Sequence, residues 1–266
     1  MVPSPAPSGV ITLTTDFGLQ DHYVGAMKGV MLSIFPQARL VDLSHGVQSF
    51  AIGQGAFFVR ESFRYFPSGT VHLAVVDPGV GTARRPLAAM ADGHYFIALD
   101  NGLLPLALDG VQAEAVAIDA ERWGLQHRSS TFHGRDVFAP AAAWLASGKP
   151  LQEIGPPVED WIRLPPPAAE PGVKAGHVLN IDRFGNIVTS LQPQELPAHF
   201  ELQVGTLATR RLCPSYEAAP AGEAFAIVGS AGLVEISMRQ ESAAARAGLH
   251  IGDAVLVHTL IEHPHG

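Results

Sequence analysis

The feature that most constrains the fold is an alternation of short apolar runs with segments of helical periodicity, which extends to about residue 155. Between the first two runs, Val24, Met27 and Met31 recur at helical spacing, and Pro36 ends the pattern. Such runs suit strands covered on both faces, and strands that alternate with helices indicate a largely parallel sheet flanked by helices. Ligands of such sheets bind beyond the carboxyl ends of the strands. The runs are 10–15, 39–43, 70–76, 95–99 and 114–118.

The pattern changes at a proline-rich stretch, L-P-P-P-A-A-E-P-G (164–172), which reads as a linker. Shorter strand-like segments separated by turn residues follow it and predict a small antiparallel barrel or sandwich. Residues 241–249 predict one short helix closed by Gly248. We expect an N-terminal α/β domain (9–163) and a smaller C-terminal β domain (173–260). The segments are 177–182, 186–191, 200–204, 223–228 and 233–237.

Composition excludes several classes of protein. The formal net charge of −8 lacks the basic footprint of a nucleic-acid-binding protein. Cys213 is the only cysteine, which rules out an intrachain disulfide and favours a reducing compartment. No apolar run reaches the roughly 18 residues that cross a bilayer, and the first residues lack the features of a signal peptide. We expect a cytoplasmic protein that does not enter membranes.

Polar residues follow the predicted strands at three places in the first domain, and one turn of the second domain gathers three candidates. An aspartate after a strand is often only a turn former or a helix cap, and Asp21 could cap a helix that starts near Tyr23. Arg84 and Arg85 could be a solvated pair, and a lone histidine is more often structural. The candidates are Asp16 and Asp21 in 14–21, Asp77 and Arg84 in 74–85, His133 in 130–136, and Asp182, Phe184 and Asn186 in 181–186.

General motifs do not identify the chemistry. G-V-G-T (79–82) lacks the third glycine of a dinucleotide-binding loop and the Lys-Ser/Thr pair of a P-loop. H-E-x-x-H is absent, and a single cysteine excludes a cysteine-rich zinc site. The histidines at 258, 263 and 265 could bind a metal, but a frayed polar tail is favoured. Pattern rules alone predict a two-domain α/β protein with a carboxylate-rich cleft.

Six stretches in a fixed order are more specific. They closely resemble the S-adenosylmethionine hydroxide adenosyltransferases, or adenosine-forming S-adenosylmethionine hydrolases, whose relatives are the fluorinases and chlorinases. The resemblance runs from about residue 10 to about 257 and implies a homotrimer. S-adenosylmethionine would be the substrate, with no cofactor, bound between the N-terminal domain of one subunit and the C-terminal domain of the next. The stretches are T-T-D-F-G (14–18), V-D-L-S-H (41–45), V-V-D-P-G-V-G-T-A-R-R (75–85), D-N-G-L-L (100–104), T-F-H-G-R-D (131–136) and I-D-R-F-G-N (181–186).

The resemblance also implies which residues bind the substrate. Asp16 would hold the ribose hydroxyls, because a carboxylate can accept hydrogen bonds from two neighbouring O–H groups. Gly229 departs from the asparagine that is usual in the family. The other implied roles are Asp21 at the methionine ammonium, Ser230 near the methionine carboxylate, Asp182 at the methionine part, Phe50 beside the ribose, Phe184 and Tyr216 on the two faces of adenine, Asn186 at its edge, and the backbone of Met238 and Gln240 completing the adenine contacts.

Three further positions match the residues that surround the attacking water in hydrolytic members: Asp77, Arg84 and His133. The fluorinase pattern has a tyrosine where Asp77 stands, so the resemblance favours water over halide as the nucleophile. A guanidinium beside a carboxylate makes it a weaker base. We therefore hypothesise that Asp77 and Arg84 orient the water and that His133 takes or relays its proton. The alternatives are a halogenase and a non-catalytic protein that binds S-adenosylmethionine or adenosine.

Overall fold

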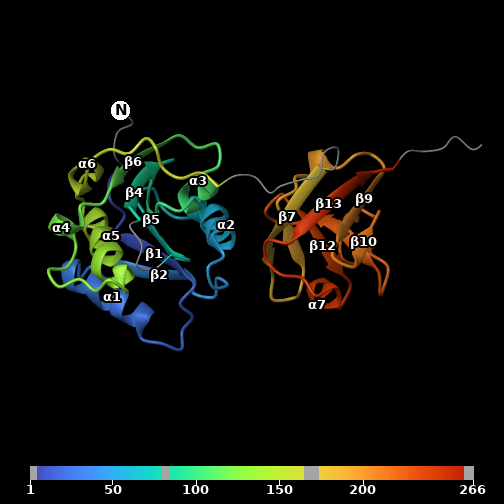
Figure 1. Cartoon of the computed structure of the whole chain (residues 1–266), viewed down its shortest axis with the longest axis horizontal. Coiled ribbons are helices and arrows are strands. Elements are labelled where there is room, and N and C mark those ends of the chain that lie inside the picture. The colour runs from blue at the N-terminus through green and yellow to red at the C-terminus, as the bar shows by residue number, and fades with distance from the viewer. Residues whose placement is uncertain (1–4, 80–83, 165–173, 261–266) are drawn as a thin grey trace, which may run out of the picture. The chain divides into compact units, whose positions relative to one another are not determined.

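The computed structural model describes residues 5–79, 84–164 and 174–260 (Figure 1). The chain divides into two compact units, 1–164 and 165–266. Most of the predicted linker, from residue 165 on, lies outside the described residues, as do residues 80–83 and the histidines at 263 and 265.

The N-terminal unit is a six-stranded sheet between two layers of helices, in the order β2-β1-β3-β5-β4-β6. The strands β1, β2, β3 and β5 run parallel, and β4 is antiparallel to both its neighbours. The prediction of a largely parallel sheet is confirmed. The strands are β1 (Val10–Thr15), β2 (Arg39–Ser44), β3 (Val71–Val75), β4 (Pro86–Ala91), β5 (His94–Leu99) and β6 (Ala113–Ala117).

Each face of this sheet has its own apolar core. Met27 and Met31 of α1 pack with the alanine-rich α5 on one face. Val59 of α2 and Leu103 of α3 pack on the other, and Figure 1 shows the two helix pairs on opposite sides of the strands. The helices are α1 (Tyr23–Ile34), α2 (Ile52–Ser62), α3 (Leu103–Ala107), α4 (Ala120–Trp123), α5 (Ala139–Ala146) and α6 (Leu151–Ile154), with a 3-10 turn (Phe63–Tyr65) and a π-helical turn (Gly134–Phe138).

Two strands differ from the sequence predictions. Strand β4 was not predicted, because its P-L-A-A-M-A sequence lacks β-branched residues. It is joined to β5 by Asp92–Gly93, both with positive φ, the backbone that Asp-Gly favours in a two-residue hairpin. The prediction that all the strands are covered on both faces is wrong for β2. This strand forms the edge of the sheet, and Val41 remains 38% exposed.

The C-terminal unit is a seven-stranded antiparallel sheet in the order β10-β9-β13-β7-β8-β12-β11. The chain after β10 hydrogen-bonds to β11 through Arg211, Cys213 and Ala226, which brings the two edges together. The predicted barrel-like architecture is confirmed. The strands are β7 (Lys174–Ile181), β8 (Ile187–Thr189), β9 (Phe200–Val204), β10 (Leu207–Thr209), β11 (Ala224–Val228), β12 (Val234–Met238) and β13 (Ala254–Thr259).

The predicted short helix is α7 (Ala243–Ala247). Ser242 caps its start by accepting a hydrogen bond from the Ala245 amide, and Gly248 ends it with φ of 65°. Across the described residues, no helix is long and apolar enough to cross a membrane. The same residues contain no group of three His, Cys, Asp or Glu side chains placed to hold a metal ion.

Candidate active site

Two carboxylates meet at one edge of the N-terminal sheet. Strands β1 and β3 are parallel neighbours, with Thr15 paired to Val75, so Asp16 and Asp77 follow their ends side by side. Burial raises the pKa of Asp16, the Phe50 amide opposes that shift, and the charge of Asp77 adds to it. The sequence prediction that each residue follows the end of a strand is confirmed, and the structure adds that the two strands are neighbours.

Asp77 is a buried carboxylate that accepts hydrogen bonds from Arg84 and Gly79. Its Oδ2 accepts a hydrogen bond from Nη2 of Arg84 at 2.5 Å, and its Oδ1 accepts one from the Gly79 amide at 3.0 Å. The side chains of Asp77 and Arg84 are only 10% and 12% exposed. The interpretation of Arg84 as part of a solvated pair is therefore wrong. Charge-assisted hydrogen bonds of this kind fix both groups in position.

Asp16 is tied to an unusual backbone conformation at Phe50. The Phe50 amide donates to Oδ2 of Asp16 at 3.0 Å. Phe50 has a φ of 69°, which is uncommon for a bulky residue, and the residue is 63% exposed. Such backbone strain is concentrated at functional sites. Here the strained conformation directs the Phe50 amide toward the Asp16 carboxylate and leaves Phe50 exposed.

The stretch that carries His133 lies against the stretch that carries Asp16. The ring of Phe132 meets the rings of Phe17 and Tyr23 with centroid distances of 6.2 Å and 5.1 Å. His133 is partly buried at the start of the π-helical turn, close enough to Asp136 to influence the pKa of that carboxyl. Among the described residues, no hydrogen bond joins His133 to Asp77.

Asp136, in the same stretch, has a structural role. Its buried carboxylate accepts hydrogen bonds from Nε and Nη2 of Arg135 at 2.6 Å and 3.0 Å, and from the Ser129 amide at 2.7 Å. Burial raises the pKa of Asp136, but the hydrogen bonds from Arg135 and Ser129 outweigh this effect and hold the pKa below its ordinary value. This network fixes the backbone around His133.

Asp21 is exposed and does not cap the first helix. The residue at the cap position of α1 is His22, and no side chain there accepts a capping hydrogen bond. The interpretation of Asp21 as a helix cap is therefore wrong. A carboxylate in solvent beside this edge of the sheet is available to a cationic group.

The C-terminal unit contributes a cavity of about 590 Å³. Two aromatic side chains on its wall are uncovered, since Phe184 is 77% exposed and Tyr216 is 44% exposed. Ser230 lies apart from it, exposed in the turn between β11 and β12. The lining residues are Asp182, Phe184, Asn186, Tyr216, Met238, Gln240, Glu241 and Ser242, so the structure brings together six of the seven residues expected in this domain.

Asp182 builds the turn that presents Asn186. Its Oδ1 accepts from the amides of Phe184 and Asn186 at 2.8 Å and 2.9 Å, and its Oδ2 accepts from Nδ2 of Asn186 at 2.8 Å. Because Nδ2 is used in this way, the carbonyl oxygen of the Asn186 amide is left for a ligand donor. Gly185 has φ of 85°, and a Cβ there would lie 2.0 Å from Oγ of Ser242. This turn therefore requires glycine.

Glu235 was not predicted from the sequence. It anchors the Tyr216 side chain through the tyrosine hydroxyl. Oε2 of Glu235 accepts a hydrogen bond from the Tyr216 hydroxyl at 3.2 Å. Burial raises the pKa of Glu235, the Tyr216 bond opposes that shift, and the charge of Asp182 adds to it. A Cβ at Gly229 would lie 1.7 Å from Oε1 of Glu235. The glycine at position 229 was the available signal, because the carboxylate occupies the space that a side chain would need.

The fold and these two sets of residues define a class: a two-domain protein with a charged strand-end site on one unit and an aromatic-walled cavity on the other. The chain belongs to the SAM hydroxide adenosyltransferase family. The model of the family's N-terminal domain matches residues 11–155, and that of its C-terminal domain matches 176–256.

Relatives cover nearly the whole chain. A protein from Salinispora arenicola named (R)-S-adenosyl-L-methionine hydrolase is 39% identical over 257 residues, which cover 93% of this chain and 97% of that protein. A fluorinase from Nocardia brasiliensis is 28% identical, covering 93% of this chain and 96% of its own. The crystal structure of an uncharacterized conserved protein from Thermotoga maritima has a TM-score of 0.82 at 31% identity, covering 93% of this chain and all of that one.

Proposed function

We propose that this protein hydrolyses S-adenosyl-L-methionine by attack of water at C5′ of the adenosyl group, giving adenosine and L-methionine. The observation that carries the proposal is the buried Asp77–Arg84 pair beside Asp16, within a chain of this family. Sequence identity also favours a hydrolase over a halogenase. The Salinispora arenicola protein named as a hydrolase is 39% identical to this chain, whereas the Nocardia brasiliensis fluorinase is 28% identical.

The reaction needs an activated nucleophile and no acid. Methionine leaves as a neutral thioether, whereas full proton transfer from water to an ordinary aspartate would cost roughly 16 kcal/mol. A positioned base that acts during attack is worth about 10²–10⁴ in rate. Asp77 and Arg84 orient the water, and Arg84 stabilises the charge that develops on it. His133 takes or relays the proton.

The binding groups divide between the units. In the N-terminal unit, Asp16 holds the ribose hydroxyls, Phe50 covers the sugar, and Asp21 faces the methionine ammonium. In the C-terminal unit, the cavity takes adenine between aromatic faces, as proteins commonly hold an extruded base. The remaining roles are Phe184 and Tyr216 on the adenine faces, Asn186 at its edge, the backbone of Met238 and Gln240 beside it, Asp182 orienting Asn186 and helping to hold the methionine part, and Ser230 near the methionine carboxylate.

The active assembly is a homotrimer in which the N-terminal unit of one subunit and the C-terminal unit of the next hold each substrate molecule. The exposed rings of Phe50 and Phe184 support this assignment, because each half of the site presents an aromatic face with no cover of its own. The protein acts in the cytoplasm and needs no cofactor. A chelator should therefore leave the rate unchanged.

The relative's name specifies the (R) form of the substrate, and we assign the same form to this protein. Displacement at C5′ is in line with the departing sulfur, so the configuration at sulfur changes only the directions of the methyl and methionine groups. Discrimination between the two forms would therefore come from the contacts of those groups with the protein rather than from Asp77 and Arg84.

The test is product analysis in water enriched in ¹⁸O, with the (R) and (S) substrates, with and without chloride, and with Asp77→Asn beside the wild type. We expect ¹⁸O in the 5′-hydroxyl of adenosine, unlabelled methionine, no effect of chloride, and little product from Asp77→Asn. A 5′-halo-5′-deoxyadenosine would instead identify a halogenase. Tight binding of intact substrate without turnover would identify a receptor.

A further inference from the structure

The D-N-G-L-L stretch (100–104) has no assigned role in the reaction, yet the sheet topology places it next to the segments that carry Asp77 and Arg84. Strand β5 lies between β3 and β4 in the sheet. Residues directly after β5 therefore lie between the residues that follow β3 and those that precede β4. Asp100 and Asn101 occupy this place, and they are only 5% and 9% exposed.

The Asn101 side chain hydrogen-bonds to the peptide group that precedes Asp77. Its Nδ2 donates to the carbonyl oxygen of Val76 at 2.9 Å, and its Oδ1 accepts from the Leu103 amide at 3.2 Å. The Val76 carbonyl belongs to the peptide group shared with Asp77. Because the amide of Asn101 is fixed at both ends, it holds the backbone on which the Asp77 carboxylate stands.

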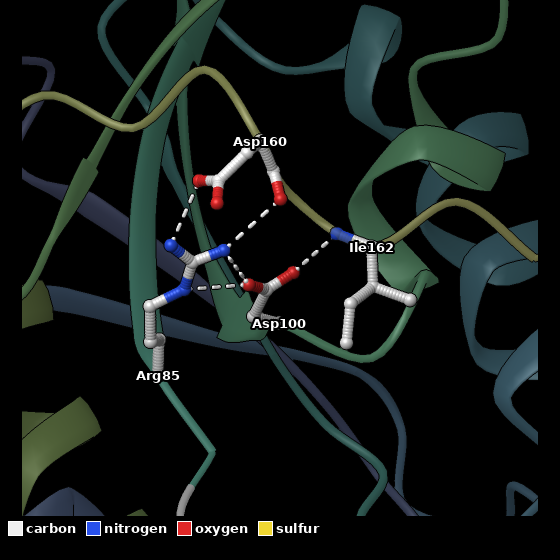
Figure 2. Close-up of polar contacts among 4 residues, drawn as sticks. All are labelled: Arg85, Asp100, Asp160 and Ile162. Atoms are coloured by element: carbon white, nitrogen blue, oxygen red, sulfur yellow. Dashed lines mark hydrogen bonds and ion pairs between the residues drawn. The ribbon is translucent and has the colours of Figure 1, made fainter.

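Asp100 binds Arg85, the residue that follows Arg84 (Figure 2). Its Oδ2 accepts from Nε and Nη2 of Arg85 at 2.8 Å and 2.6 Å, and its own amide donates to the Arg85 carbonyl at 2.9 Å. Its Oδ1 accepts from the Ile162 amide at 2.7 Å. The Asp100 side chain is 4% exposed. Arg85 is therefore held at its carbonyl by the Asp100 amide and at its guanidinium by the buried Asp100 carboxylate.

Asp160 contacts the same guanidinium from the solvent side. Its Oδ1 accepts from Nη1 of Arg85 at 2.8 Å, but its side chain is 82% exposed. Exposed ion pairs of this kind contribute little. Asp160 therefore provides a matched control: the same arginine and the same kind of contact, outside the buried network.

We propose that Asp100 and Asn101 are positioning residues for the reaction, which together hold the two ends of the segment that carries Asp77 and Arg84. Asn101 acts through Val76 and Asp100 acts through Arg85. This inference rests on the proposed function, because the geometry it maintains is that of the pair that orients water. The competing explanation is that Asp100 and Arg85 only fasten residues 160–162 to the N-terminal unit.

The test compares Asp100→Asn, Asn101→Asp and Asp160→Asn in the full-length protein. Calorimetric titration with adenosine gives its Kd and the number of intact sites, and kcat is then expressed per intact site, which removes any loss due to unfolding. We expect Asp100→Asn and Asn101→Asp to lower kcat per site by about tenfold or more with the Kd of adenosine unchanged, since a displacement of about 1 Å can cost 10² in rate. Asp160→Asn should match the wild type.

The outcomes separate this inference from the proposed function. An active wild type with Asp100→Asn within threefold of it in kcat per site overturns the positioning role and leaves the hydrolase intact. Equal losses in Asp100→Asn and Asp160→Asn would also overturn it, because fastening residues 160–162 would then explain both. A wild type that releases no adenosine from either form of the substrate overturns the proposed function and, with it, the role of the two residues. If Asn101→Asp does not fold, the kcat per site of Asp100→Asn is sufficient to test the positioning role.

Discussion

The reacting pair of the N-terminal unit and the aromatic residues of the C-terminal unit are presented in opposite ways. In the N-terminal unit the reacting groups are buried and held, as shown by the 10% exposure of the Asp77 side chain and its contacts with Arg84 and Gly79. In the C-terminal unit the two aromatic residues of the cavity wall are open, with Phe184 77% exposed and Tyr216 44% exposed.

This difference follows from what each unit has to do. A group that aims a nucleophile must be fixed before the substrate arrives, because its advantage lies in the transition state. A ring that stacks on a base needs a free face, which becomes buried only when the ligand binds. Substitutions of the Asp77–Arg84 pair should therefore lower kcat, whereas substitutions of the aromatic residues in the cavity should weaken binding.

The largest effect is expected for Asp77→Asn, which preserves the shape of the side chain and removes its charge. We expect kcat to fall by about 10²–10³, because the variant loses the charged partner that helps Arg84 to orient the water, while the Kd of adenosine stays within about twofold. Steady-state kinetics and calorimetry measure the two quantities, and Asp109→Asn provides an exposed control in the same unit. A large loss of adenosine affinity in Asp77→Asn would break the distinction between the units.

Phe184→Ala tests the other side of the comparison. We expect the affinity for adenosine to fall by about 1–3 kcal/mol, the usual contribution of an aromatic ring stacked on a base, with little change in kcat. The thermal midpoint should be unchanged, because the ring is exposed without ligand. Tyr65→Ala, which removes a ring that is 87% exposed outside the site, should bind adenosine as the wild type does.

Some functional residues could be predicted from the sequence, whereas the partners of others could not. Asp16 and Asp77 could be found because each follows an apolar run, and Phe184 and Asn186 because a single turn carries both. Asn101 could not be assigned a partner, because its bond to Val76 depends on β5 lying between β3 and β4. Strand order is a property of long-range packing, whereas periodicity reports only local structure.

The N-terminal unit should also be sensitive to acid. Burial lowers the pKa of His72 from 6.5 to about 3, and the neighbouring His94 adds to this shift. The Nδ1 of His72 lies 2.8 Å from Oγ1 of Thr12, its Nε2 lies 3.2 Å from Nδ1 of His94, and the ring of Phe96 stacks on it. Below pH 6.5 the unfolded chain therefore binds a proton that the folded chain does not.

Stability should consequently fall as the pH drops from 6.5 toward 3, by about 2 kcal/mol between pH 7 and pH 5 from His72 alone. Urea unfolding followed by tryptophan fluorescence measures this, because Trp123, Trp144 and Trp161 all lie in the N-terminal unit. His72→Gln should show a smaller difference between the two pH values than the wild type. Equal differences would mean that His72 is protonated in the folded protein.

The smallest effect is expected for Tyr216→Phe, which keeps the ring and removes the hydroxyl that donates to Glu235. The ring stays packed edge-on against Phe225 at a centroid distance of 5.8 Å, so only its anchoring changes. We expect the Kd of adenosine to rise by about threefold, the share of one modest hydrogen bond, with kcat unchanged. Tyr65→Phe is the control for the loss of a hydroxyl. A fall in kcat at constant Kd would instead mean that the cavity also positions the reacting carbon, and that its aromatic residues act in the chemistry as well as in binding.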